Sequence, residues 1–118
     1  MIESFEEIVK LSLLFDFYGE MLGDHKKKIF EDYVLNDLSL AEIAEEEGIS
    51  RQGVHDIVKR CTKQLKEYEE ALHLVEKFQN MKNKLTKASE LLGNKHKEAD
   101  ASDIEEARTL LAEMLEEL

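Results

Sequence analysis

The residue types that most often perform catalysis are scattered along this chain of 118 residues. The four histidines lie far apart, as His25, His55, His73 and His96, and they form neither an HExxH motif nor a paired Cys/His spacing. The single Cys61 excludes an internal disulfide framework, and the chain contains no glycine-rich phosphate loop. The many carboxylates fall on helix faces that we expect to be solvated. We therefore expect no catalytic residue, no cofactor and no metal site, and we interpret the protein as a non-enzyme.

A group of basic side chains has a spacing that suits binding instead. Residues 50–66 contain five cations and one acid, Asp56, although the whole chain carries a net charge of −11. Cations gathered on one helix of an acidic protein favour binding to DNA at one place and discourage non-specific binding. The alternative is an ordinary solvated basic face. The five cations are Arg51, Lys59, Arg60, Lys63 and Lys66.

The elements that must position these cations form a helix-turn-helix pattern. The stretch from Ser39 to Lys66 predicts a short helix, a turn at Gly48 and a second helix that begins at Ser50. Gly48 can adopt the left-handed conformation that ends a helix without a steric penalty. Ser39 with Glu42 has the spacing of a capping box, and serine is a good N-cap. The residues expected to join the two helices are Ala44, Gly48, Ile49, Val54 and Ile57.

Two positions depart from this pattern. Glu47 occupies a place where an apolar residue is usual, so it must point to solvent or find a partner. Gly53 lies in the first turn of the second helix, where alanine would be more stable by roughly 0.5–1 kcal/mol. Gly53 either permits a close backbone approach, to a DNA groove or to the first helix, or is a tolerated weak position.

If the second helix enters a major groove, the outward side chains of its N-terminal half contact base edges. Arginine is suited to guanine and glutamine to adenine. A single copy with so few cations would bind weakly, so we expect a DNA-binding homodimer. The expected base-facing residues are Arg51, Gln52, His55 and Asp56, and the expected phosphate-facing residues are Ser39, Ser50, Lys59, Arg60 and Lys63.

The rest of the chain is predicted to be helical, because the whole chain has no proline and only five glycines. Ser4 with Glu7 predicts a first helix over about residues 4–22, whose apolar residues cover more than one stripe. Asp24 is expected to cap a second helix over about 25–36. The cations at 26–28 in its first turn either meet phosphates or form a solvated basic turn.

Beyond Lys66 no stop signal is present. The apolar spacing predicts one long amphipathic helix that ends near residues 93–94, with a break near 80–83. A polar linker over 93–101 and an acidic helix that opens at Ser102 follow, and the six lysines between 77 and 97 are suited to pairing with that acidic helix. We divide the chain into residues 1–66, with the motif at 39–60, and a helical extension over 67–118 that we expect to mediate dimerisation or another interaction.

Three segments carry a resemblance that goes beyond the generic motif. LLFDFYGEML (13–22), FEDYVLNDLSLAEIAEEEGISRQGVHDIVKR (30–60) and LKEYEEALHLVEKF (65–78) resemble the YlxM family, small bacterial helix-turn-helix proteins encoded beside genes of the signal recognition particle pathway. The resemblance covers about residues 11–80 and implies an all-α protein that regulates, or works with, this pathway. The motif also resembles region 4 of primary sigma factors, within the winged-helix-like DNA-binding superfamily. That second resemblance points to Arg51, Gln52, His55 and Asp56 as base-facing positions.

The sequence leaves three functions open. The first is sequence-specific DNA binding in transcription regulation, and the second is a protein-interaction module that binds a component of the signal recognition particle machinery without DNA. Binding to the particle's RNA ranks third, because the three tyrosines are not interleaved with the cations. No signal peptide and no long apolar span is seen, so we expect a cytoplasmic protein without membrane partners.

Overall fold

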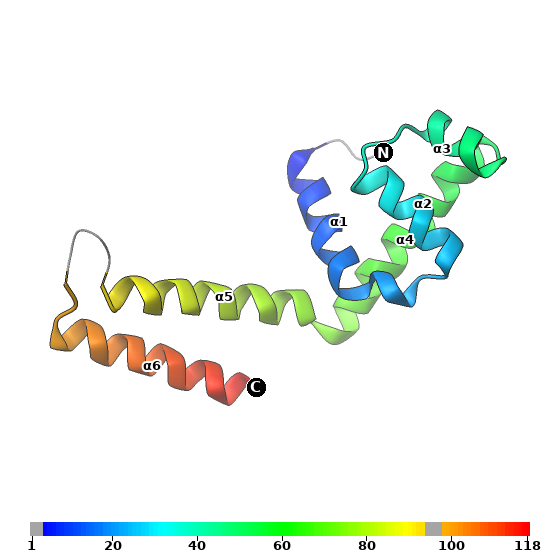
Figure 1. Cartoon of the computed structure of the whole chain (residues 1–118). Helices are drawn as coiled ribbons and strands as arrows, with labels where there is room; N and C mark the ends of the chain where they lie inside the picture. The colour runs from blue at the N-terminus through cyan, green and yellow to red at the C-terminus, as the bar shows by residue number, and fades with distance from the viewer. Residues whose placement is uncertain (1–3, 94–97) are drawn as a thin grey trace. The chain divides into compact units, whose positions relative to one another are not determined.

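The computed structural model describes residues 4–93 and 98–118, and these residues are mostly helical (Figure 1). This confirms the all-α prediction. The contacts divide the chain into two compact units, the first extending to Val75 and the second running from Glu76 to Leu118. The helices are α1 (Phe5–Tyr18), α2 (Asp24–Val34), α3 (Leu40–Glu47), α4 (Arg51–Leu72), α5 (Leu74–Leu91) and α6 (Ala101–Glu117), with a short 3-10 helix η1 (Gly19–Met21) after α1.

The core of the first unit forms where α1, α2 and α3 pack against α4. The rings of Phe15 and Phe30 stack with their centroids 5.6 Å apart. Ile43, Val58 and Leu65 are fully buried beside them. Burial of such side chains contributes roughly 1.5–3 kcal/mol each, so this core fixes the position of α4 in the unit.

Two boundaries near the N-terminus differ from the prediction. The N-cap Ser4 is confirmed, because its hydroxyl accepts a hydrogen bond of 3.1 Å from the Glu7 amide. However, α1 ends at Tyr18 and not near residue 22, because the chain tightens into η1. Asp24 was wrongly expected to be a cap: Gly23 is the N-cap of α2, and Asp24 is the first helical residue.

The break in the long helix also differs. The sequence predicted it near residues 80–83, but α4 ends at Leu72, and its C-cap His73 has a left-handed backbone with φ of 57°. Tyr18 and Glu69 stabilise this break. The Tyr18 hydroxyl donates to a Glu69 carboxylate oxygen at 2.5 Å and accepts from the Leu74 amide at 3.1 Å, while the Val75 amide donates to the same Glu69 oxygen at 2.9 Å.

These contacts explain why the first unit is longer than expected. The sequence placed the division after Lys66, whereas the compact units divide after Val75. Residues 67–75 contain Tyr68, which packs against the core, and the hydrogen-bonded group around Glu69. The last turns of α4 therefore belong with α1.

In the second unit α5 and α6 form an antiparallel hairpin. Lys84 pairs with Glu113 at 3.7 Å and also with Glu117, and Lys87 pairs with Glu106 at 3.3 Å. The predicted pairing between lysines and the acidic helix is thus observed for these two. Helix α6 begins two residues earlier than predicted. Its N-cap is Asp100, in a capping box with Asp103, and not Ser102. Of the predicted linker 93–101, residues 94–97 lie outside the described part of the chain, as do His96 and two of the six lysines.

In the part of the chain that the structure describes, no helix has both the length and the apolar composition needed to span a bilayer.

Candidate nucleic-acid interface

The helix-turn-helix forms through the local signals read from the sequence. The Ser39 hydroxyl accepts from the Glu42 amide at 3.1 Å, and the Ser39 amide donates to the Glu42 carboxylate at 3.2 Å, which completes the capping box. Gly48 is left-handed with φ of 68° and ends α3. The Ser50 hydroxyl accepts from the Gly53 amide at 2.9 Å and opens α4. Ser39 therefore sets the start of α3, and Gly48 and Ser50 set the turn between α3 and α4.

The inner side of the motif packs α3 and α4 against the core. Ala44 is 7% exposed and Val54 is fully buried, while Ile49 and Ile57 are half-buried and pack on the same cluster. The small Ala44 side chain suits a close approach of the two helices. Four of the five residues expected to join the helices thus lie at the corner, and the fifth, Gly48, makes the turn.

Gly53 has a local explanation in the structure. A Cβ atom built at this position would lie 3.1 Å from the Ser50 hydroxyl oxygen, which is the atom that caps α4. It would lie 3.8 Å from the Ile49 side chain, a normal van der Waals distance. The absent side chain therefore leaves room for the N-cap. The other interpretation, a close approach to a DNA groove, stays a prediction.

The outer side of α4 carries the expected DNA-binding residues. Helix periodicity places Gln52, Asp56, Lys59 and Lys63 opposite the side that buries Val54, Val58, Cys61 and Leu65. Arg51, at the first position of the helix, and Arg60 are also exposed. His55 was expected to point outward, but its side chain is half-buried. Its Nδ1 atom is buried without a hydrogen-bond partner and lies 3.7 Å from an Asp56 oxygen.

The charges on this outer side are mostly uncompensated. Within residues 4–93 and 98–118, Arg51, Lys59 and Arg60 make no ion pair, while Lys63 lies 3.9 Å from Glu67. Asp56 is the single acid within residues 50–66, and its carboxylate accepts a 3.0 Å hydrogen bond from the Gln52 amide. The Gln52 amide is thereby held on the exposed surface of α4. Ser39 and Ser50 are exposed, each with its oxygen engaged as a helix cap and its hydroxyl hydrogen still free to donate.

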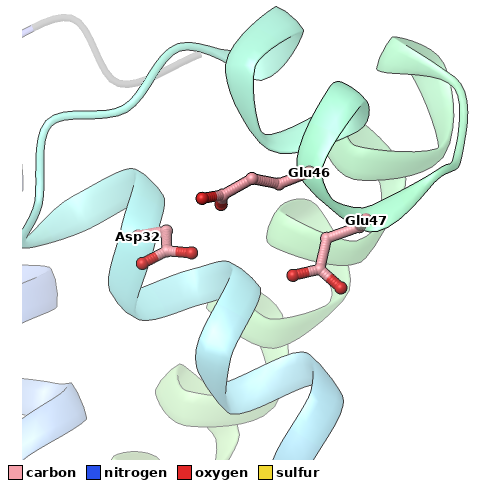
Figure 2. Close-up of side chains that lie close together, drawn as sticks. All are labelled: Asp32, Glu46 and Glu47. Carbon is pink, nitrogen blue, oxygen red and sulfur yellow. The ribbon is translucent and has the colours of Figure 1, made fainter.

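Three carboxylates come together at the junction of α2 and α3. Asp32, Glu46 and Glu47 have oxygen atoms within 4.8 Å of one another (Figure 2). The Lys28 ammonium lies among them, 3.1 Å from Asp32, 3.1 Å from Glu47 and 3.8 Å from Glu46. The group is therefore an ion-pair network that fastens α3 to α2.

This network answers the question posed by Glu47 in the sequence. Its side chain is 14% exposed, and it accepts hydrogen bonds from Lys28 and from the His25 ring at 3.1 Å. The bond from Lys28 holds the pKa of Glu47 below its ordinary value, and the same bond raises the pKa of Lys28. The apolar residue usual at this place is thus replaced by a bonded carboxylate.

Two of the three lysines in the first turn of α2 form ion pairs with carboxylates of the same chain. Lys28 belongs to the network above, and Lys27 pairs with Glu20, which raises the pKa of Lys27. Neither side chain is therefore free to serve as a phosphate contact without losing its carboxylate partner. Of the three cations at 26–28, which the sequence predicted either to meet phosphates or to form a solvated basic turn, only Lys26 is left for the first role. The single cysteine, Cys61, is buried, and burial raises the pKa of its thiol.

Sequence reasoning did not connect Lys28 with Asp32 and Glu47. The i, i+4 spacing of Lys28 and Asp32 is a recognisable signal for a helical ion pair. The contact with Glu47 spans nineteen residues and depends on how α2 packs against α3. That part could not be read from spacing alone.

Comparisons with known proteins agree with this geometry. Residues 5–106 match the family model described as "Putative helix-turn-helix protein, YlxM / p13 like". The UPF0122 protein YlxM of Bacillus subtilis (strain 168) is 43% identical over 115 residues, 98% of each chain. A UPF0122 protein of Caldanaerobacter subterraneus is 48% identical over 87 residues, 74% of each chain, and one of Bacillus velezensis is 43% identical over 115 residues, 98% of each.

The family match covers most of the chain, and it is a helix-turn-helix family rather than a family of enzymes. The resemblance to the YlxM family inferred from the sequence is thereby confirmed. The chain belongs to the YlxM / p13-like family of helix-turn-helix proteins.

Proposed function

We propose that the protein binds duplex DNA in a sequence-specific manner through α4. The observation that carries this proposal is the exposed outer side of α4, where Arg51, Lys59 and Arg60 have no carboxylate partner among the described residues. In an acidic protein, where many other cations are ion-paired, unpaired cations on one motif helix fit a polyanionic ligand.

The proposed contacts divide into two groups. Arg51, Gln52, His55 and Asp56, in the N-terminal half of α4, face base edges in the major groove. The remaining contacts hold the phosphate backbone and set the register. They are Ser39 and Ser50 at the starts of the two motif helices, and Lys59, Arg60 and Lys63 along α4.

We further propose that the protein acts as a homodimer in transcription regulation of genes of the signal recognition particle pathway. The sequence resemblance to the YlxM family supports this choice of genes. Two copies would place two α4 helices on half-sites roughly 34 Å apart, one turn of the duplex. Doubling the number of cations would offset the weak binding expected of one copy.

A hydroxyl-radical footprint on the DNA upstream of the protein's own operon tests this proposal. We expect two protected patches about one helical turn apart, and their loss in an Arg51→Ala, Lys59→Ala variant. Uniform protection along the fragment, equal for wild type and variant, would contradict sequence-specific reading by α4.

One observation favours a second candidate, a module that binds a protein of the targeting machinery without DNA. Apolar side chains on the outer side of α1 are exposed, with Phe5 at 80% and Val9 at 43%. Such side chains, on a helix that also exposes the acids Glu6 and Asp16, suit a partner with an apolar and basic surface. A Phe5→Glu, Val9→Glu variant separates the candidates: it should lose affinity for the purified partner protein and keep its affinity for DNA.

A further inference from the structure

The hairpin of the second unit carries a continuous apolar repeat on both helices. Side chains recur at spacings of three and four residues, which is the 3.5-residue period of helices that pack as a left-handed bundle. On α5 the repeat consists of Phe78, Met81, Leu85 and Ala88, and Leu92 continues it just after the helix. On α6 it consists of Ile104, Ala107, Leu111 and Met114, and Leu118 continues it just after the helix.

Alternate members of this repeat have opposite exposure. Ala88, Ala107 and Met114 are 1–7% exposed, because they lie between α5 and α6. The other members are exposed, except the half-buried Met81. We call them, with their neighbour Leu115, the apolar side of the hairpin; they are 41–85% exposed and comprise Phe78, Leu85, Leu92, Ile104, Leu111, Leu115 and Leu118.

These residues lie together, because the ion pairs occupy the opposite side. With about 3.6 residues per turn, Lys84 and Lys87 project from one side of the line that joins Met81 to Ala88, whereas Phe78 and Leu85 project from the other. On α6, by the same rule, the glutamates that pair with these lysines project away from Ile104 and Leu111. The two helices are antiparallel, and their ion-paired residues lie on the same face of the hairpin. The exposed apolar residues of both helices therefore lie together on the opposite face.

We propose that the apolar side of the hairpin binds the same surface of a second copy of this chain, so that two hairpins form a four-helix bundle. Both helices keep the period that such bundles require, and the surface is therefore self-complementary in its spacing. The proposal deepens the homodimer of the proposed function by naming its interface, and it rests on that proposal for its role in DNA binding.

Charge also fits a second copy. Helix α5 contains four lysines and two glutamates, whereas α6 contains six acids and one arginine, Arg108. Lys84 and Lys87 already pair with glutamates of α6 within the hairpin, so a two-fold arrangement that sets α5 of one copy beside α6 of its partner is favoured because it keeps the two acidic α6 helices apart. The like-charged arrangement, α6 beside α6, would repel.

The extent of the surface is adequate for this purpose. The seven side chains present on the order of 600 Å² of apolar surface per copy, which is the upper end of what a monomer leaves exposed in one patch. Two such surfaces would bury about 1,200 Å² in total, the lower end of stable specific interfaces. Isologous contact between two copies would also give the hairpin a core that its own two helices do not supply.

The test is the mass of the full chain in solution by sedimentation equilibrium, without DNA, over a series of dilutions. The test variant is Leu85→Glu with Leu111→Glu, which places charges on the apolar side. The matched control is Asn83→Glu with Thr109→Glu, which adds the same charges to exposed positions of the same helices away from that side. Helix content is followed by circular dichroism. Leu115→Glu is a second test variant, and because Leu115 is 72% exposed the change should leave each hairpin folded.

We expect the wild type and the control to have twice the chain mass of 13.7 kDa, and both test variants to sediment at the single-chain mass or to need a higher concentration for association. A wild type that stays at 13.7 kDa at the highest concentration would overturn the proposal. So would a Leu115→Glu variant that associates as tightly as the wild type. Because no DNA is present, a negative result in this experiment would overturn the dimer interface without bearing on the proposed DNA contacts of α4, which the DNA-binding experiment tests separately.

Discussion

At the scale of single residues, Asp56 has an effect on binding that can be separated from folding. It is the single acid on the exposed N-terminal half of α4, and it holds the Gln52 amide with a 3.0 Å hydrogen bond. We predict that Asp56→Asn increases affinity for non-specific DNA a few-fold at low salt, because it removes a negative charge near phosphates. Competition binding with a random-sequence duplex measures this. Unchanged or weaker non-specific binding would contradict the placement of Asp56 at the DNA.

Glu47 makes a prediction about pH. The hydrogen bond from Lys28 lowers the pKa of the Glu47 carboxyl in the folded protein below the ordinary value of 4.5. The resulting stabilisation is therefore complete above that ordinary value and is lost as the pH falls through the lower folded pKa. We expect a Glu47→Gln variant to be less stable than the wild type at neutral pH and to approach it in acid.

Thermal unfolding at several pH values tests this expectation. Glu45→Gln is the matched control, because Glu45 is a neighbouring exposed glutamate for which the described residues show no ion pair. A constant difference in Tm between wild type and Glu47→Gln across the acid range would show that the pair with Lys28 does not act through the charge of Glu47.

Gly48 makes a prediction about stability. Its φ of 68° lies in the left-handed region, and a Cβ at this position would meet no atom within 4 Å. The cost of Gly48→Ala should therefore be that of the backbone alone, about 1 kcal/mol. Gly48→Asn should lose less, because asparagine tolerates this conformation. Urea unfolding measures both, and an alanine variant as stable as the asparagine variant would refute this account of the turn.

At the scale of elements, Tyr18 and Glu69 determine where α4 ends. The fully buried Tyr18 hydroxyl links the Glu69 carboxylate to the Leu74 amide, and burial together with the bond to Glu69 raises the pKa of this phenol. Tyr18→Phe leaves both partners without that hydroxyl, and we expect a loss of about 1–3 kcal/mol in the free energy of unfolding. Phe17→Leu, at the half-buried neighbouring position, is the comparison. Equal losses would mean that packing rather than hydrogen bonding is measured.

The same elements show what the sequence could predict. Caps and turns are local, so Ser39, Gly48 and Ser50 were placed correctly from residue types and spacing alone. The break at His73 was missed because histidine is not a stop signal, and its left-handed backbone is held by Tyr18, which is distant in sequence. The N-cap of α6 was misplaced by two residues because Asp100 and Ser102 both have suitable side chains at capping-box spacing.

The candidate interface was predictable to a similar degree. The exposure of Arg51, Lys59 and Arg60 follows from helix periodicity once the buried side of α4 is known. The half-buried state of His55 and the engagement of Gln52 by Asp56 depend on side-chain positions that periodicity does not specify.

At the scale of the whole molecule, the negative and positive charges are gathered in different segments of the chain. The net charge of −11 is concentrated outside residues 50–66, because residues 98–118 contain eight acids and one arginine, whereas residues 50–66 contain five cations and one acid. This arrangement predicts an electrostatic contribution to DNA binding that comes from few side chains. The dependence of affinity on salt should therefore be modest for one copy and should fall measurably when a single phosphate contact is removed.

The most direct test of the central claim, that α4 binds DNA, is fluorescence anisotropy with the operon's upstream duplex at two salt concentrations. The variant is Arg51→Ala with Lys59→Ala, and the matched control is Lys10→Ala with Lys82→Ala, two exposed cations outside the motif. The account predicts binding that weakens with salt, is unchanged in the control, and is lost or reduced at least tenfold in the variant, as expected for about 1–3 kcal/mol from a base contact together with a phosphate contact. No binding by the wild type at low salt, or equal losses in variant and control, would contradict it.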